Sequence, residues 1–256
     1  AFCTGQRVVL RFGSVTHTAK VWLNGTLIAQ HKGGFTPFEA DVTALLHPGE
    51  MALLTVACDN RVNHSTLPVG NEEGQLAFFG SDNAGIPSVE AAKRIAAPQN
   101  RPNFDFFNYA GIHRPVWLYT TPKDYIEDVT VVPHTDGTVQ YMVKAIGSAP
   151  VHVTVLEADG KAVASAEGAA GTLTIPEVQL WEPKPGTPYL YTLHITCGAD
   201  VYDQTFGVRS VEVRGTQVLL NGKPLYFKGF CKHEDFTAHG RGFDPVLNVK
   251  DVNLLH

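Results

Sequence analysis

Four polar side chains follow closely on a run of apolar residues near residue 230. The apolar run is Leu225-Tyr226-Phe227, and the polar cluster is Lys232-His233-Glu234-Asp235. Polar groups at the carboxyl end of a buried strand are what a (β/α)₈ barrel offers to a substrate. The alternative interpretation is a hairpin loop that carries solvated charges. A zinc site built on His233 and His239 matches no common ligand spacing, so the sequence predicts no metal and no cofactor.

A second candidate is a carboxylate inside an aromatic segment. Asp105 lies among Phe104, Phe106, Phe107 and Tyr109. Aromatic faces cover the apolar C–H surface of a sugar, while a carboxylate accepts hydrogen bonds from its hydroxyl groups. The alternative is an aromatic core segment in which Asp105 caps a turn. The residues alone leave both interpretations open.

Other chemical motifs are weak. Glu72 and Glu73 are adjacent on a loop flanked by glycine, so they cannot be held at the separation that a pair of glycosidase carboxylates needs. The sequence contains no G-x-S-x-G elbow, no P-loop and no dinucleotide-binding fingerprint.

Length and composition indicate an ordinary globular protein. The chain has 256 residues, enough for two domains, with 44% hydrophobic and 18% charged residues. A net charge of −5 suggests neither a nucleic-acid partner nor a basic membrane-binding patch, and the apolar runs fall short of the ~20 residues of a membrane span.

The cysteines bear on the cellular compartment. The four cysteines are widely spaced, which indicates reduced thiols, mostly buried, in a cytoplasmic bacterial protein. The chain starts at Ala1 without an initiator Met, so we expect a shortened N-terminus, and a lysosomal or secreted location stays open as the alternative.

The first half of the chain predicts short strands, at 7–12, 20–23, 26–29, 51–58 and 115–120. Asn24-Gly25 favours a type I′ hairpin turn, because both central residues of that turn need a positive φ. The segment 51–58 is apolar almost throughout and is expected to be buried on both faces. Residues 59–103 form a long connection, which in a compact domain is functional or disordered.

The second half has the spacing of a β-sandwich. The expected strands are 126–133, 138–146, 151–158, 173–176, 189–196 and 201–208, which suits one immunoglobulin-like unit. Asp159-Gly160 marks a further hairpin, and Asn221-Gly222 marks a third between 211–220 and the apolar run at 225–227.

Taken together, five stretches resemble glycoside hydrolase family 2, and within it the β-glucuronidases. The stretches are 15–17 (VTH), 33–43 (GGFTPFEADVT), 106–114 (FFNYAGIHR), 118–122 (LYTTP) and 227–235 (FKGFCKHED). The resemblance implies a mainly β chain of three modules. These are a jelly-roll sugar-binding domain at 1–122 that is incomplete at its N-terminus, an immunoglobulin-like β-sandwich at 123–212, and the start of a truncated (β/α)₈ catalytic barrel at 213–256.

The resemblance also implies a function, the hydrolysis of β-D-glucuronides by a retaining glycoside hydrolase of carbohydrate metabolism. Asp105 and His233 would contact the sugar at the −1 position, and the candidate supporting residues are Asn108, Arg114, Glu234 and Asp235. The acid/base and nucleophile glutamates of the family have no counterpart in this chain, so we expect the chain alone to be inactive. The parent enzyme would bind a small-molecule β-glucuronide and form a homo-oligomer, a tetramer.

Two alternatives remain open. One is a non-catalytic carbohydrate-binding module made of the jelly roll and the sandwich. The other is a family 2 relative that cleaves β-galactosides or β-mannosides. The sequence of residues 108–114 favours the glucuronidases, but selectivity for a uronate rests on the resemblance alone.

Overall fold

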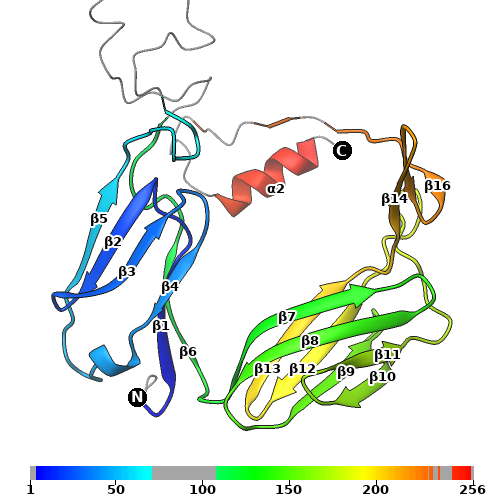
Figure 1. Ribbon diagram of the computed structural model, residues 1–256, viewed down its shortest axis with the longest axis horizontal. Helices are drawn as coiled ribbons and strands as arrows, with labels where there is room; N and C mark the ends of the chain where they lie inside the picture. The colour runs from blue at the N-terminus through cyan, green and yellow to red at the C-terminus, as the bar shows by residue number, and fades with distance from the viewer. Residues whose placement is uncertain (1–3, 71–107, 230, 233–235, 237–243, 255–256) are drawn as a thin grey trace, which may run out of the picture. The chain divides into compact units, whose positions relative to one another are not determined.

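The computed structural model describes residues 4–70, 108–229, 231–232, 236 and 244–254. The protein is mainly β, and it divides into two compact units (Figure 1). The first unit comprises Ala1–Thr120 and Lys232–His256, and the second comprises Thr121–Cys231. The mainly β architecture expected from the sequence is confirmed.

The first unit contains two three-stranded antiparallel sheets in its described part. One has the order β4-β1-β6 and the other the order β3-β2-β5. The strands are β1 (Arg7–Phe12), β2 (Thr18–Leu23), β3 (Thr26–Lys32), β4 (Phe38–Asp41), β5 (Leu54–Asp59) and β6 (Val116–Thr121). A short 3₁₀ helix, η1 (Thr43–Leu45), follows β4. The sheets share a core to which β1 contributes Val8, Leu10 and Phe12, and β2 contributes Ala19, Val21 and Leu23.

The hairpin between β2 and β3 forms where Asn24-Gly25 predicted it. Asn24 has φ 49° and Gly25 has φ 81°, the positive values that a type I′ turn requires. β2 pairs with β3 on one side and with β5 on the other, so it is the central strand of its sheet.

The expectation that 51–58 is buried on both faces is wrong. Met51 is fully exposed, and Leu53 is 70% exposed. The strand itself, β5, begins only at Leu54, and only Val56 of its apolar side chains is packed against the core. β5 lies at the edge of its described sheet, so apolar composition did not translate into burial on both faces.

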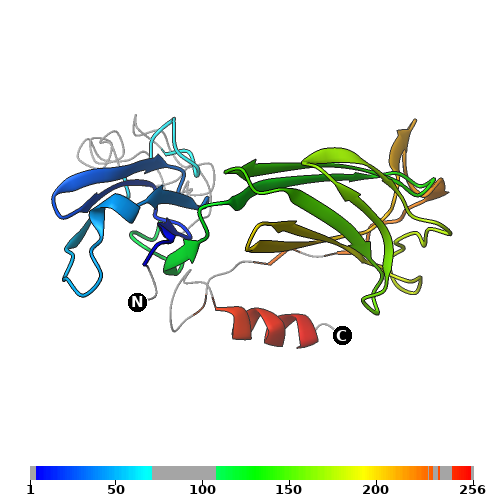
Figure 2. The same ribbon diagram turned by 90° about the horizontal axis from the view of Figure 1, so that it is seen from below.

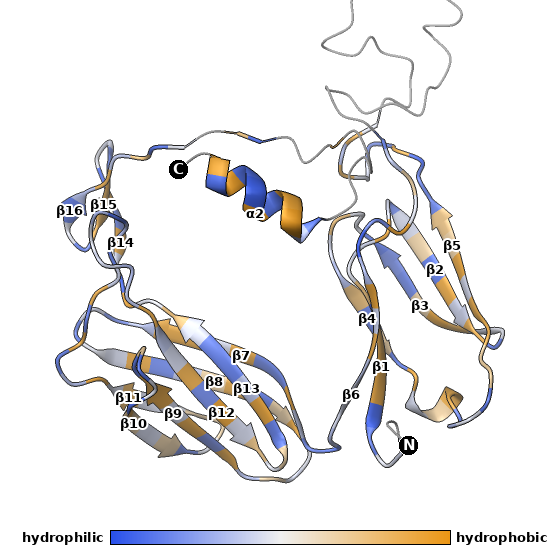
Figure 3. Cartoon of the chain, turned by 180° about the vertical axis from the view of Figure 1, so that it is seen from behind, coloured by the Kyte–Doolittle hydropathy of each residue, from blue (hydrophilic) through white to orange (hydrophobic). Residues whose placement is uncertain are grey.

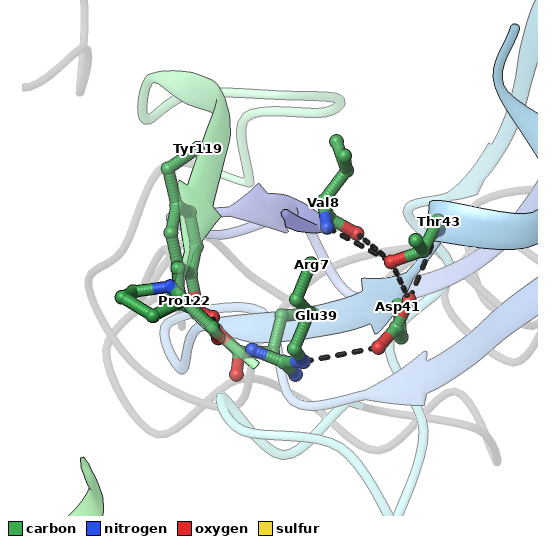
Figure 4. A network of polar contacts seen from close by, with 8 residues as sticks. Arg7, Val8, Glu39, Asp41, Thr43, Tyr119 and Pro122 are labelled. Atoms are coloured by element: carbon green, nitrogen blue, oxygen red, sulfur yellow. Dashed lines mark hydrogen bonds and ion pairs between the residues drawn. The ribbon is translucent and has the colours of Figure 1, made fainter. Parts of the chain in front are cut away.

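Polar contacts hold β1 to β4 at the surface of the first unit (Figure 4). Arg7 Nε donates to Asp41 Oδ2 at 3.0 Å, and the Thr43 hydroxyl donates to Asp41 Oδ1 at 2.6 Å. Partial burial works to raise the pKa of Asp41. The hydrogen bonds from Thr43 and Arg7 outweigh burial, so the pKa lies below its ordinary value.

The second unit is a β-sandwich, which confirms the immunoglobulin-like expectation. A four-stranded sheet with the order β10-β9-β12-β13 faces a three-stranded sheet with the order β11-β8-β7. Figure 2 shows the two layers along their edges. The strands are β7 (Tyr125–Pro133), β8 (Thr138–Ile146), β9 (Val151–Leu156), β10 (Ala162–Glu167), β11 (Ala170–Thr174), β12 (Tyr191–Cys197) and β13 (Asp200–Phe206).

The sandwich core follows from strict alternation along its strands. In β12, Tyr191, Leu193, Ile195 and Cys197 point inward and are buried, while the residues between them are partly exposed. Hydrophobic and polar bands accordingly alternate along the strands of this unit in Figure 3. The sequence missed β10, since its residues are mostly alanine, serine and glutamate and have low strand propensity.

A small sheet follows the sandwich in the second unit. It consists of β14 (Val211–Arg214), β15 (Gln217–Leu220) and β16 (Lys223–Pro224), with Asn221-Gly222 as the predicted turn. Asn221 ties this sheet down, because its Oδ1 accepts from the Ser210 amide at 3.0 Å and its Nδ2 donates to the Trp181 carbonyl at 3.1 Å. Leu219 and Leu220 are buried.

Two further expectations are corrected by the structure. Residues 225–229 form no strand: the Leu225 amide still donates to the Val218 carbonyl of β15 at 2.8 Å, but Tyr226 and Phe227 beyond it are 82% and 69% exposed. Among the described cysteines, Cys197 is buried, but Cys58 and Cys231 are exposed, so the expectation of mostly buried thiols is wrong. All three are free thiols.

One α-helix lies near the end of the chain. α2 (Pro245–Leu254) begins after Asp244, whose Oδ1 accepts from the amides of Val246 and Leu247 at 2.9 and 3.1 Å. This is an N-cap followed by proline at the first helical position. Among the described helices, none has the length and apolarity that crossing a membrane would take.

The buried side chains of β12 should dominate the stability of the sandwich. Leu193 is 0% exposed, so we expect Leu193→Ala to lower the free energy of unfolding by about 2–5 kcal/mol, through lost burial and the cavity left behind. As the matched control, Val201→Ala changes a side chain that is 54% exposed and should cost less than about 1 kcal/mol. Urea denaturation followed by circular dichroism measures both, and equal costs would contradict the assignment of the core.

Candidate functional site

The predicted site residues divide between described and undescribed parts of the chain. Asp105, His233, Glu234 and Asp235 lie outside the described residues. Asn108 and Arg114 are described, and both belong to the first unit. The roles of all six stay predictions, and the site is built below from the two that the structure places.

Asn108 is fixed at both ends of its side-chain amide. Its Oδ1 lies 2.6 Å from His17 Nε2, and its Nδ2 donates to the Asn60 carbonyl at 2.9 Å. The side chain is half-buried. Asn108 therefore joins the segment that leads into β6 to two other segments of the first unit.

His17 immediately precedes the central strand β2. Its amide donates to the Asp59 carbonyl at 2.7 Å, and its carbonyl accepts from the Gly33 amide at 3.0 Å. These two bonds continue the pairing of β2 with β5 and β3 by one residue. The side chain of His17 is 1% exposed, so the imidazole lies in the interior of the unit.

The residues before His17 hold the rest of the same segment. The Thr16 amide donates to the Gly111 carbonyl at 3.0 Å, and the Thr16 hydroxyl donates to the Tyr109 carbonyl at 2.8 Å. Ser14, which is fully buried, pairs through its hydroxyl with His113 Nε2 at 2.7 Å. Residues 14–17 thus run beside 108–113 and meet many of its polar groups, which burial requires.

The glycine pair at 33–34 closes this cluster. A Cβ on Gly34 would lie 2.8 Å from His17 Nδ1 and 3.0 Å from the Thr16 methyl group, so only glycine fits without movement. The ring of Phe35 meets both histidines edge-on, with centroids 6.2 Å from His17 and 5.5 Å from His113. Arg114 makes a long contact of 3.5 Å with the Phe35 carbonyl.

Three of the stretches noted in the sequence therefore meet in one place. We call this set the His17 cluster, and it consists of Ser14, Thr16, His17, Gly34, Phe35, Asn60, Asn108 and His113. The sequence assigned a role only to Asn108 among these residues. His17 carried a signal, because it belongs to the stretch 15–17, but Asn60 and Ser14 carried none.

One carboxylate lies beside the His17 cluster. Asp59 forms hydrogen bonds and an ion pair with Arg61, the shortest at 2.5 Å. The hydrogen bonds from the Arg61 side chain and amide lower the pKa of Asp59 to about 2. Asp59 is therefore a permanent anion at neutral pH and is a poor proton donor.

Elsewhere in the described chain, the candidate sites lack the groups for glycoside hydrolysis or metal binding. A groove of about 730 Å³ in the second unit is lined by residues of β7, β13 and the segment after β13, and its charged lining residue is Arg209, which lies 5.2 Å from the Trp181 ring centroid. No carboxylate lines this groove, which leaves it without the groups of glycoside hydrolysis. Among the described residues, no group of three or more His, Cys, Asp or Glu could hold a metal ion.

Lys232, from the polar cluster of the sequence, binds helix α2. Its Nζ lies 3.0 Å from Asn248 Oδ1 and 2.5 Å from Asp251 Oδ2. Lys232 is thus engaged with the helix that follows it, and its neighbours at 233–235 lie outside the described residues.

The close approach at Gly34 can be tested by adding one methyl group. We expect Gly34→Ala to lower the free energy of unfolding by about 1–3 kcal/mol, because the new methyl group must displace His17 or Thr16. Gly229→Ala is the control, since no atom lies within 4 Å of a Cβ there, and it should cost less than about 0.5 kcal/mol. Thermal unfolding of both variants measures the difference. A Gly34→Ala variant as stable as the wild type would contradict the close approach of Gly34 to His17 and Thr16.

The ion pair of Asp59 should make stability depend on pH in the acid range. The pKa of Asp59 is about 2 in the folded protein, against about 3.9 for an unfolded Asp, so its contribution is complete above the unfolded value and disappears as the pH falls toward 2. Asp59→Asn should therefore lower the melting temperature at neutral pH, and its gap to the wild type should close between about pH 4 and pH 2. Glu50→Gln, at an exposed carboxyl of the same unit, is the control for the loss of one surface charge. A difference in melting temperature between Asp59→Asn and the wild type that stays constant over this range would refute the low pKa of Asp59.

Comparison with models of known protein families gives matches along almost the whole chain. Models of glycosyl hydrolases family 2 match residues 2–122 (sugar binding domain), 122–209 and 211–256 (TIM barrel domain). A β-glucuronidase of Paenibacillus borealis is 42% identical over 98% of this chain and 41% of its own length. The chain spans about two fifths of the length of the curated relatives that it matches.

Solved structures agree with these matches. A β-glucuronidase of Faecalibacterium prausnitzii is 90% identical with a TM-score of 0.92, over 100% of this chain and 43% of that one. A β-glucuronidase of Bifidobacterium dentium is 48% identical with a TM-score of 0.88, over 99% of this chain and 44% of that one. With three models of a single family spanning residues 2–256 almost without a gap, the chain belongs to glycoside hydrolase family 2.

Proposed function

We propose that this chain is part of a retaining β-glucuronidase that hydrolyses β-D-glucuronides. The observation that carries the proposal is the 90% identity, over the full chain, to a solved structure described as a β-glucuronidase.

The ligands of related structures support the choice of sugar. The Bifidobacterium dentium enzyme was solved with coumarin-3-O-glucuronide, and a β-glucuronidase of Ruminococcus gnavus, 35% identical to this chain, was solved with D-glucuronic acid. A small-molecule β-glucuronide is therefore the substrate that we propose.

The chemistry would need two carboxylates about 5–5.5 Å apart, one as the nucleophile and one as the acid and base. We propose that the part of the enzyme not represented in these 256 residues supplies both. This chain would contribute groups that bind and orient the sugar. Asp105 and His233 remain the residues that the resemblance predicts for direct contact, with Glu234 and Asp235 as candidate support.

The geometry of Asn108 supports a positioning role for it. Both polar ends of its side chain are already bonded to protein, to His17 and to the Asn60 carbonyl, so its role is to fix the segment that carries it. Arg114 lies in the same segment and makes a long contact to the Phe35 carbonyl, and we propose it as a weaker support. Homo-oligomeric assembly and a cytoplasmic location stay predictions from the sequence.

Enzyme assays separate this proposal from its alternatives. The 256-residue chain, purified alone, should give no turnover of a chromogenic β-D-glucuronide above background. The full natural polypeptide that carries it should hydrolyse that substrate and should leave the matching β-galactoside and β-mannoside intact. Turnover by the 256-residue chain, or a preference for the galactoside or mannoside by the full polypeptide, would overturn the proposal. Calorimetry with glucuronate and galactose completes the test, since tight binding to the isolated chain in an inactive polypeptide would favour a carbohydrate-binding module.

A further inference from the structure

His17 is a buried ionisable residue to which neither the sequence motifs nor the proposed chemistry gives a role. Its side chain is 1% exposed, and its backbone is fixed by hydrogen bonds to Asp59 and Gly33 on either side. Burying an imidazole costs free energy unless its polar atoms are bonded. The bonds that His17 makes therefore indicate what it is for.

The hydrogen-bond pattern fixes the direction of the bond between His17 and Asn108. Asn108 uses its amide nitrogen to donate to the Asn60 carbonyl at 2.9 Å, so the atom that faces His17 is the carbonyl oxygen. That oxygen can only accept, and His17 Nε2 must carry the proton. The bond of 2.6 Å is therefore a donation from His17 to Asn108.

The surroundings of the other ring nitrogen, Nδ1, differ from those of Nε2. His17 Nδ1 is buried and has no hydrogen-bond partner among the described residues. It faces Gly34, where even a methyl group would lie 2.8 Å away. Among the described residues, the ring therefore makes its side-chain hydrogen bond through Nε2, and a leucine in the same space would not provide that donor.

The bond reaches a segment that is otherwise irregular. Residues 108–111 belong to no strand, and only Gly111 forms an isolated bridge, to Thr16. The hydrogen bonds that connect them to the rest of the unit include three from Thr16, the one to the Asn60 carbonyl and the one to His17. Among these bonds, the one from His17 is donated by a side chain to the side chain of Asn108.

We infer that His17 is a positioning residue of the sugar site, which acts by donating a hydrogen bond to Asn108 and so fixing the course of residues 108–111. The inference rests on the proposed function, because it assumes that this segment serves the sugar. It assigns His17 no contact with substrate. A histidine that only filled the core would need no donor at Nε2, and any apolar residue of similar size would replace it.

Two substitutions at residue 17 separate the roles. His17→Gln keeps an amide N–H donor close to the position of Nε2, whereas His17→Leu fills the space without a donor. Both variants are made in the full natural polypeptide that carries this chain and are compared with the wild type in thermal stability and in kcat/KM for a chromogenic glucuronide. We expect His17→Leu to lower kcat/KM by about tenfold and His17→Gln to stay within about threefold, since a buried acceptor is left unmet only in the first.

Amide hydrogen exchange in the same variants gives a readout that does not depend on activity. The Thr16 amide donates to the Gly111 carbonyl, and the Gly33 amide donates to the His17 carbonyl. His17→Leu should speed exchange at Thr16 and leave Gly33 protected, because it loosens 108–111 without unfolding the strand end. His17→Gln should leave both amides protected.

A double variant completes the test. Asn108→Leu removes the acceptor, so His17→Leu should cost little further in kcat/KM when combined with it. Equal impairment by Gln and Leu at residue 17, additive losses in the double variant, or normal kcat/KM in a folded His17→Leu protein would each overturn the inference. If the wild type hydrolyses no glucuronide, the proposed function fails, and the exchange pattern still decides whether His17 holds residues 108–111.

Discussion

The hydrogen bond between His17 and Asn108 is the interaction on which the arrangement of the first unit's irregular segments depends. An irregular segment that packs against a core carries backbone polar groups that no sheet pairs for it. In this unit Thr16 bonds to the Tyr109 and Gly111 carbonyls, while the Asn108 side chain bonds to the His17 imidazole and to the Asn60 carbonyl. The constraint extends to Gly34, which must remain without a side chain so that the ring can be buried.

The sequence predicted the regular parts of the fold well, and the reason is local. Asn24-Gly25, Asp159-Gly160 and Asn221-Gly222 all mark hairpin turns, because the turns require positive φ values that Gly and Asn tolerate. Alternating strands such as β8 were predicted with their observed bounds, since a two-residue period is visible without any tertiary information. Helix α2 was missed although Asp244-Pro245 is a recognisable start signal, because its apolar residues form no clear stripe.

Burial was predicted less well, because it depends on neighbours that a single segment does not reveal. The apolar strand β5 and the run at 225–227 were both expected to be buried, and both are largely exposed in the described structure. The candidate site shows the same limit. Asn108 stood out in a motif, but its partners His17 and Asn60 are 91 and 48 residues away, and their side chains and carbonyls meet only after the sheet has formed.

The attachment of the small sheet β14–β15–β16 has a consequence for how the second unit unfolds. This sheet contains only two deeply buried side chains, Leu219 and Leu220, too few for it to be stable alone. Asn221 binds it to the Ser210 amide and the Trp181 carbonyl, which belong to the connections around the sandwich strands. The small sheet therefore depends on the sandwich for its stability, and we expect the two to unfold together in a single transition.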